Sequence, residues 1–160
     1  MVAGSRRVCI VDDDDVVRNS LRRLLEAYDI ETTSYASGID FLSHHRRGQF
    51  GCLILDVELP GLSGLDVLSH LRSVANDNTP AIVITGRGDP FLKQRILTAG
   101  ASAFLDKPFG AETLVEIVEQ LLAGNIAGSS AVFSILSSRC LVLLNVRPEA
   151  LNDIACPDNL

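Results

Sequence analysis

Through residue 123 of the 160-residue chain, short apolar runs alternate with longer stretches in which apolar residues recur every three or four positions. A short, fully apolar run fits a strand that is covered on both faces. The predicted strands are Val8–Val11, Glu31–Tyr35, Cys52–Leu55, Ala81–Ile84 and Ala103–Leu105. The second of them is polar, which predicts a place near an edge of the sheet.

The stretches between these runs have helical spacing. In the first, the apolar positions are Val17, Leu21, Leu24, Leu25 and Tyr28, and Asp14 or Asp15 is a candidate N-cap. Further helices are expected at Ile39 to Arg47, around Leu65, Leu68 and Leu71, at Pro90 to Ala99 with Gly100 closing it, and at Ala111 to Ala123. Alternating strands and helices predict an α/β fold: a doubly wound (βα)5 parallel sheet of order 2-1-3-4-5 in a flavodoxin-like three-layer sandwich.

The pattern changes after residue 123. Residues 124–130 read as a linker, and two apolar runs follow at Ala131–Leu136 and Cys140–Val146. The expected organisation is one domain at 1–123 and an atypical, poorly ordered tail at 124–160.

Composition narrows the function classes. The net charge of −6 disfavours binding to a nucleic-acid backbone. The four cysteines form no CxxC pair, which fits a reducing compartment. No apolar segment reaches the roughly 20 residues of a membrane helix, and none resembles a signal peptide. A cytoplasmic protein that does not enter membranes is expected.

The polar residues that matter most fall at the strand ends. Asp12 and Asp13 follow the first strand, Asp56 the third, Thr85 the fourth, and Lys107 comes just after the fifth. The carboxyl ends of parallel strands meet at one edge, so these side chains should share a pocket. Three carboxylates so close repel one another unless a hard cation such as Mg²⁺ offsets them. Asp56 beside that metal is then a candidate nucleophile, with Lys107 and Thr85 as partners for phosphoryl oxygens.

Each of these residues also has an ordinary explanation when it is taken alone. An acidic run is favoured at a helix start. Asp56 is compatible with a turn, Thr85 with a strand end, and Lys107 with a surface charge. Their occurrence together, each at the end of a different buried strand, is much more specific than any one of them.

Residues 6 to 123 resemble the response-regulator receiver domain, which is CheY-like, and within it the FixJ/NarL-like branch. The segments that carry the resemblance are Val8–Asp14, Leu53–Gly64, Ile82–Asp89 and Gly100–Phe109.

The resemblance implies a role for each site residue. Asp56 would be the phosphoacceptor, Asp13 and Asp56 direct Mg²⁺ ligands, Asp12 a ligand through water, and the backbone carbonyl of Glu58 a further ligand. Thr85 and Lys107 would bind the phosphoryl group. The Lys107–Pro108 peptide bond is expected to be cis. Phe104 stands at the position of an aromatic switch residue, although an ordinary core phenylalanine is nearly as good an interpretation.

Two features depart from the family pattern. Glu58 is an acidic side chain two residues after the acceptor, where it would affect metal affinity or dephosphorylation. The tail has neither the length, the basic charge nor the helical period of the helix-turn-helix output domain that members of the branch often carry.

The leading hypothesis is a phosphorelay receiver that accepts a phosphoryl group from a histidine kinase and is not an enzyme in its own right. Its output would be contact with a downstream protein or a second copy, through the face of the fourth helix, fifth strand and fifth helix. We assign that face to Lys93, Arg95, Ile96, Phe104 and Leu114, and we expect no specific DNA binding. One alternative is a Mg²⁺-dependent aspartyl-phosphate phosphatase or phosphotransferase. Such enzymes usually carry aspartate where this chain has Glu58. The other is a degenerate interaction module that takes no phosphate.

Overall fold

The computed structural model describes residues 5–86 and 89–123. Five strands form one parallel sheet in the order β2-β1-β3-β4-β5, as predicted. The strands are β1 (Arg7–Val11), β2 (Glu31–Tyr35), β3 (Cys52–Asp56), β4 (Ala81–Thr85) and β5 (Ala103–Asp106). The helices are α1 (Asp15–Glu26), α2 (Gly38–His44), α3 (Gly64–Ser73), α4 (Pro90–Thr98) and α5 (Ala111–Leu122). The tail at 124–160, and the expectation that it is poorly ordered, lie outside the described residues.

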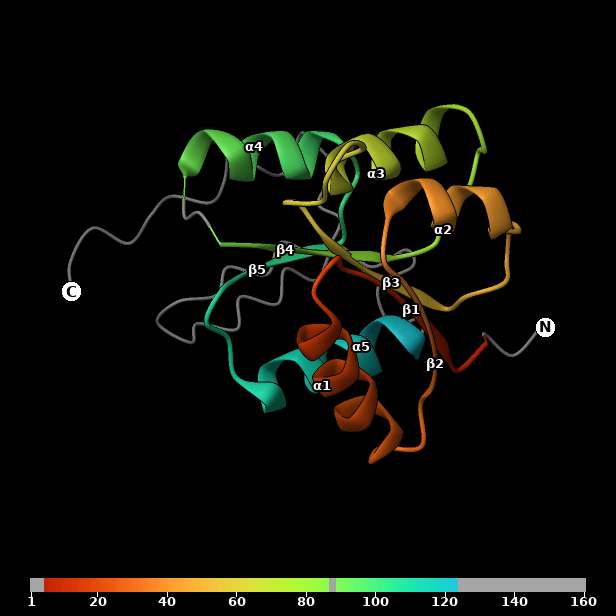
Figure 1. Ribbon diagram of the computed structural model, residues 1–160, viewed down its shortest axis with the longest axis vertical. Coiled ribbons are helices and arrows are strands. Elements are labelled where there is room, and N and C mark those ends of the chain that lie inside the picture. The colour runs from red at the N-terminus through yellow and green to blue at the C-terminus, as the bar shows by residue number, and fades with distance from the viewer. Residues whose placement is uncertain (1–4, 87–88, 124–160) are drawn as a thin grey trace.

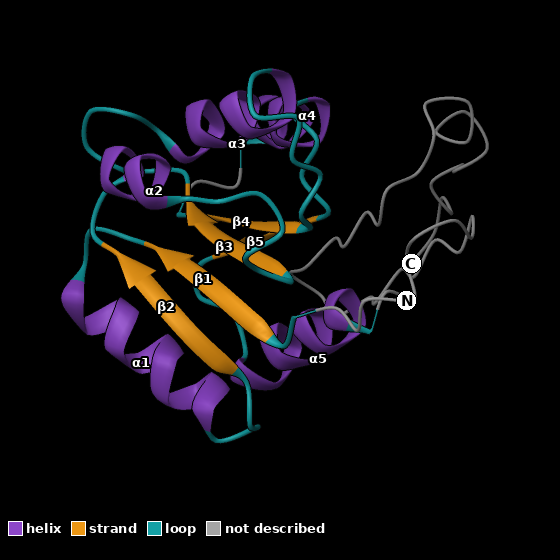
Figure 2. Ribbon diagram, turned by 90° about the vertical axis from the view of Figure 1, so that its right-hand side faces the viewer, coloured by secondary structure: helices purple, strands orange, loops and turns teal. Residues whose placement is uncertain are grey.

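The helices cover both faces of the sheet. Helices α2, α3 and α4 lie on one side, and α1 and α5 lie on the other (Figures 1 and 2). Successive residues of a strand point to opposite faces, so each strand supplies both layers. Val8 and Ile10 of β1 pack toward α1 and α5, whereas Cys9 and Val11 pack toward α2 and α3. This double burial explains why the inner strands read as unbroken apolar runs.

Strand β2 lies at an edge of the sheet, as its polar sequence predicted. Its five residues are exposed or half-buried, whereas all five residues of β3 and of β4 are buried. The hydrophobic residues therefore concentrate in the central strands, and Asp12 and Asp56 lie at the ends of two of these strands.

Local signals set most helix ends. Asp14 caps α1 by accepting from the Val16 and Val17 amides, and Ser37 caps α2 through the Asp40 amide. Ser63 and Asp66 form a capping box at α3. Gly100, at φ +93°, ends the α4 segment in the left-handed region, where glycine carries no steric penalty.

Three expectations about these elements were wrong. Helix α2 ends at His44 instead of Arg47, because His45 adopts an extended backbone. Tyr28 does not face the core: α1 ends at Glu26, and Tyr28 is 46% exposed. In the docking face assigned from the sequence, Ile96, Phe104 and Leu114 are at most 1% exposed and belong to the core, so they are not available to a partner.

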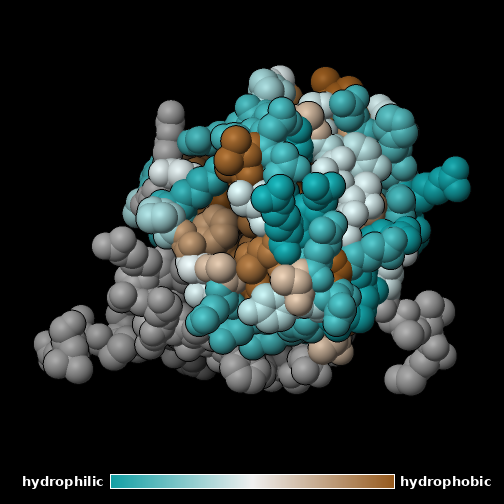
Figure 3. Space-filling model, turned by 60° about the horizontal axis from the view of Figure 1, so that its bottom comes forward, coloured by the Kyte–Doolittle hydropathy of each residue, from teal (hydrophilic) through white to brown (hydrophobic). Residues whose placement is uncertain are grey.

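The exposed surface on the side of α1 and α5 is mainly hydrophilic. Figure 3 brings this side forward and shows hydrophobic residues in small, separate patches. No helix of the described residues is long and apolar enough to cross a membrane.

Candidate functional site

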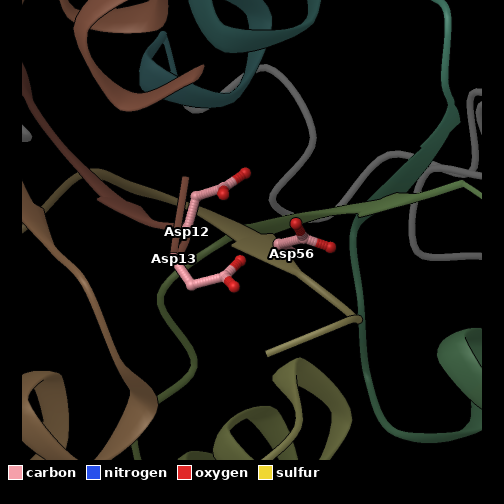
Figure 4. A group of neighbouring side chains, drawn as sticks. All are labelled: Asp12, Asp13 and Asp56. Atoms are coloured by element: carbon pink, nitrogen blue, oxygen red, sulfur yellow. The ribbon is translucent and has the colours of Figure 1, made fainter. Parts of the chain in front are cut away.

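The acidic residues from two neighbouring strands meet at the edge of the sheet where the strands end. Asp12 and Asp13 follow β1, Asp56 closes β3, and these two strands pair directly. One carboxylate oxygen from each of the three residues lies within 4.8 Å of the others. Figure 4 shows Asp12 and Asp13 beside Asp56, with their carboxylates directed to its side. The sequence prediction that these three residues converge is confirmed.

Burial separates the three carboxylates. Asp12 and Asp56 are 2% and 4% exposed, whereas Asp13 is exposed to solvent. Asp12 Oδ1 accepts from the Asp14 amide over 2.8 Å, and Asp56 Oδ1 accepts from the Glu58 amide over 2.9 Å. Each buried carboxylate thus has one backbone donor that fixes its direction.

Lys107 brings a positive charge into the pocket. Its Nζ lies 3.2 Å from Asp56 Oδ2 and 4.0 Å from Asp12 Oδ2. Burial acts to lower the pKa of Lys107, but the hydrogen bond and charge of Asp56, with the charges of Asp12 and Glu58, outweigh it and raise the pKa. The Lys107–Pro108 peptide bond is cis, the isomer that the resemblance implied.

Among the described residues, the Lys107 ammonium is the cation paired with these carboxylates, and one ammonium does not balance three acids. Burial raises the pKa of Asp12 to about 6, the charge of Asp56 adds to this, and the Asp14 amide and Lys107 oppose it. The pocket therefore has an excess of negative charge in oxygen ligands, which is the chemistry that suits Mg²⁺. The donor set fits that ion.

Thr85 and Phe104 lie on adjacent strands behind this pocket. Thr85 ends β4 with no exposed surface, and its carbonyl accepts from the Lys107 amide over 2.8 Å. Phe104 is 1% exposed and packs in the layer of α3 and α4. Lys93 Nζ lies 5.2 Å from the centre of the Phe104 ring and 2.8 Å from Asp106 Oδ2. The Lys93–Asp106 pair over this ring was not foreseen, because nothing in the sequence links a lysine on α4 with the end of β5.

Glycine 64 is a second feature that the sequence analysis missed. A Cβ atom on Gly64 would lie 2.2 Å from the Asp56 carbonyl oxygen and 2.8 Å from its carbon. Those distances exclude a side chain without a shift of the backbone, so the start of α3 is packed directly on the residue that closes β3. The signal in the sequence is a glycine directly after Ser63, the N-cap of α3.

Glu58 is close enough to the pocket for its charge to raise the pKa of Lys107. A Cβ atom on Gly86 would be 3.6 Å from Glu58 Oε2, so the glutamate carboxylate lies over the end of β4. The backbone carbonyl of Glu58 as a metal ligand stays a prediction.

Residues 8–119 match the family described as the response regulator receiver domain. This chain belongs to the response regulator receiver family. The receiver is 37% identical over 115 residues to the transcriptional regulatory protein FixJ of Azorhizobium caulinodans, covering 72% of this chain and 54% of that protein. It is 39% identical over 111 residues to nodulation protein W of Bradyrhizobium diazoefficiens, covering 69% and 48%. The chain thus spans about half the length of these curated relatives.

Solved structures show the same fold. The response regulator StyR superposes with a TM-score of 0.68 at 39% identity, covering 74% of this chain and 60% of that one. Chemotaxis protein CheY4 of Vibrio cholerae superposes with a TM-score of 0.66 at 28% identity, covering 72% and 97%. These comparisons support the flavodoxin-like, CheY-like fold that the sequence predicted.

Proposed function

We propose that this receiver accepts a phosphoryl group from a histidine kinase on the carboxylate of Asp56, in a reaction that uses Mg²⁺. The observation that carries the proposal is the cluster of Asp12, Asp13 and Asp56 oxygens within 4.8 Å, with Lys107 Nζ 3.2 Å from Asp56 Oδ2. Membership of the receiver family supports it.

The acidic residues would hold the metal. Asp13 and Asp56 would bind it directly, Asp12 through water, and the Glu58 carbonyl would be a further ligand. When bound, Mg²⁺ would offset the negative charge that builds on the phosphoryl oxygens.

The chain's own residues supply the rest of the chemistry. An Asp56 carboxylate oxygen forms the new bond to phosphorus while the bond to the donor nitrogen breaks, and the electron pair leaves with the imidazole. The Lys107 ammonium would stabilise the equatorial oxygens. Thr85, at the end of β4, would donate its hydroxyl proton to one of them.

Intact mass after incubation with Mg²⁺ and acetyl phosphate tests the assignment. We expect the wild type to gain one phosphoryl group and Asp56→Asn to gain none while keeping its fold. Asp40→Asn, an exposed acid on α2, is the matched control and should label like the wild type. Labelling of Asp56→Asn at the wild-type rate would refute the site.

We propose further that the chain is a stoichiometric acceptor and not a phosphatase or phosphotransferase that turns over small esters. Glu58 stands where such enzymes usually carry an aspartate, and its carboxylate lies over Gly86. Phosphate release from a generic phosphoester distinguishes the two functions, because an enzyme would release many equivalents of phosphate per chain. A degenerate module would show neither labelling nor release.

Switching would involve Thr85 and Phe104. Phosphate on Asp56 would draw Thr85 inward, and Phe104 would repack beneath Lys93. Contact with a downstream protein or a second copy through the α4-β5-α5 face would then use its exposed residues, such as Arg95, and not the buried ones. Sedimentation before and after phosphorylation would show self-association. Absence of specific DNA binding by this chain stays a prediction.

A further inference from the structure

Arg18 occupies an unusual place for an arginine near the start of a surface helix. Its side chain is only 15% exposed, although arginine is rarely so buried unless it is paired. Nη1 donates to the main-chain carbonyl oxygen of Asp12 over 2.5 Å, and Nη2 donates to the carboxylate of Asp15. Arg18 therefore ties α1 to the segment that follows β1.

Three further hydrogen bonds hold the segment that follows β1. The Asp12 amide donates to the Tyr35 carbonyl of β2 over 3.2 Å. Asp12 Oδ1 accepts from the Asp14 amide over 2.8 Å, and Asp14 Oδ1 accepts from the Val16 amide over 2.8 Å. Arg18 adds a hydrogen bond to the Asp12 carbonyl oxygen, so its guanidinium restrains the peptide that joins Asp12 to Asp13.

We propose that Arg18 is a positioning residue for the magnesium site, because its guanidinium fixes the peptide from which Asp12 and Asp13 present their carboxylates. The inference rests on the proposed function, since it concerns the metal that this site would hold.

Arg18 acts on metal binding in two opposite ways. Its fork orients two ligand residues, which raises affinity, and its positive charge repels a dication, which lowers affinity. The Asp15 carboxylate sits directly on the guanidinium, so the pair adds little net charge at the site. Loss of a partner that orients metal ligands typically costs 10- to 100-fold in affinity. Positioning therefore outweighs repulsion.

Arg18→Lys and Arg18→Gln separate these effects in the full 160-residue chain. Calorimetric titration with Mg²⁺ alone, without a phosphodonor, gives the affinity. We expect Arg18→Lys to bind Mg²⁺ about tenfold more weakly, because an ammonium keeps the charge but loses the planar fork. Arg18→Gln should be weakened to a similar degree.

Arg22→Lys is the matched control. Arg22 lies one turn further along α1, is 48% exposed and pairs with Glu26, so its replacement should leave Mg²⁺ affinity unchanged. The inference is overturned if Arg18→Lys binds like the wild type. It is equally overturned if Arg18→Gln binds more tightly, because repulsion then dominates.

A second readout separates positioning from a merely structural role. Phosphorylation by acetyl phosphate is followed against Mg²⁺ concentration, and circular dichroism with urea unfolding measures the folded fraction. We expect the half-saturating Mg²⁺ concentration to rise about tenfold in Arg18→Lys, with the rate restored at saturating Mg²⁺. Lowered stability with an unchanged Mg²⁺ requirement would overturn the inference. If the wild type binds no Mg²⁺, the proposed function itself is refuted. If the wild type binds Mg²⁺ and Arg18→Lys binds it with the same affinity, only the role of Arg18 is refuted.

Discussion

Asp12 and Asp77 are buried carboxylates at opposite ends of the parallel strands, and their surroundings differ. Asp12 is 2% exposed at the edge where the strands end, and Asp77 is 3% exposed at the edge where they begin. Burial by itself raises the pKa of a carboxyl group. For Asp12 burial prevails, and the pKa rises to about 6.

Around Asp77 the hydrogen bonds prevail over burial. Oδ1 accepts from the Thr79 amide over 2.9 Å and from the Thr79 hydroxyl over 2.6 Å, and Oδ2 lies 2.7 Å from His45 Nε2. Burial raises the pKa of Asp77, but these bonds outweigh it, and the net pKa is lowered. Asp12 and Asp77 are about equally buried, so the number of hydrogen-bond donors distinguishes them. Asp77 has its acceptor atoms occupied within the fold, whereas Asp12 keeps an oxygen that could bind a ligand.

We expect the largest effect on stability from removing Asp77, the acid with three hydrogen-bond partners. Asp77→Ala leaves Thr79 and His45 without their buried acceptor, and breaking a buried pair typically costs 3–5 kcal/mol. We expect the free energy of unfolding in urea to fall by about 3 kcal/mol. Glu116→Ala, at an exposed position of α5, should change it by less than about 0.5 kcal/mol. Equal losses in the two variants would remove the contrast.

A second test loosens the same edge without touching the carboxylate. Arg72 donates to the main-chain carbonyls of Asp77, Thr79 and Gly100, over 2.6, 2.8 and 3.1 Å. Lysine cannot serve three acceptors from one planar group, so Arg72→Lys should cost about 2 kcal/mol of unfolding free energy. Arg23→Lys, which is exposed on α1, is the control and should be neutral. An Arg72→Lys variant as stable as the wild type would show that the three carbonyls do not depend on the guanidinium.

At the carboxyl ends of the strands, replacing the buried acid should raise the free energy of unfolding instead of lowering it. The raised pKa means that the folded protein disfavours the ionised form of Asp12, and one pKa unit corresponds to about 1.4 kcal/mol. Asp12→Asn removes this buried charge. Near neutral pH and without Mg²⁺, we expect this variant to be more stable than the wild type by about 1–2 kcal/mol. Mg²⁺ should then stabilise the wild type more than the variant. A less stable metal-free variant would contradict the crowding of charge that the geometry indicates.

The smallest expected effect is a pH dependence. Because the pKa of folded Asp77 is lowered from 3.8, its contribution is fully present above that value and is lost as the pH falls through the lower, folded pKa. The stability difference between the wild type and Asp77→Asn should therefore shrink as the pH is lowered from about 4 toward 2. Urea midpoints across this range measure it. A difference that already shrinks near pH 6 would point to another titrating group.

The sequence predicted the edge of the sheet that carries the site better than the opposite edge. Asp12, Asp56, Thr85 and Lys107 each stand directly at or after a buried apolar run, so parallel topology brings them together. His45 and Asp77 lie in irregular segments 32 positions apart, and no periodic pattern relates such positions. Their pairing depends on how α2 and α3 end, which is decided by tertiary packing.

The errors have the same origin. Tyr28 fits the helical spacing of α1, but spacing does not reveal where the helix ends, two residues before it. The sequence predicted an exposed face that includes Ile96, Phe104 and Leu114, because apolar and basic residues are mixed there. The apolar ones pack inward against the sheet, and only the charged ones reach solvent. A mixed pattern on a helix does not separate an interface from a core boundary.

The close approach of Gly64 to Asp56 has a consequence for genetics. Gly64 has no side chain, yet any side chain there would meet the Asp56 carbonyl oxygen at 2.2 Å and displace the peptide of the proposed acceptor. A screen for loss-of-signalling alleles should therefore recover Gly64→Ala or Gly64→Ser alongside changes in the acids themselves. The three atoms that such a side chain would meet belong to the main chain, so a suppressor would have to move the backbone, and changes in the charged residues of the pocket should not restore signalling.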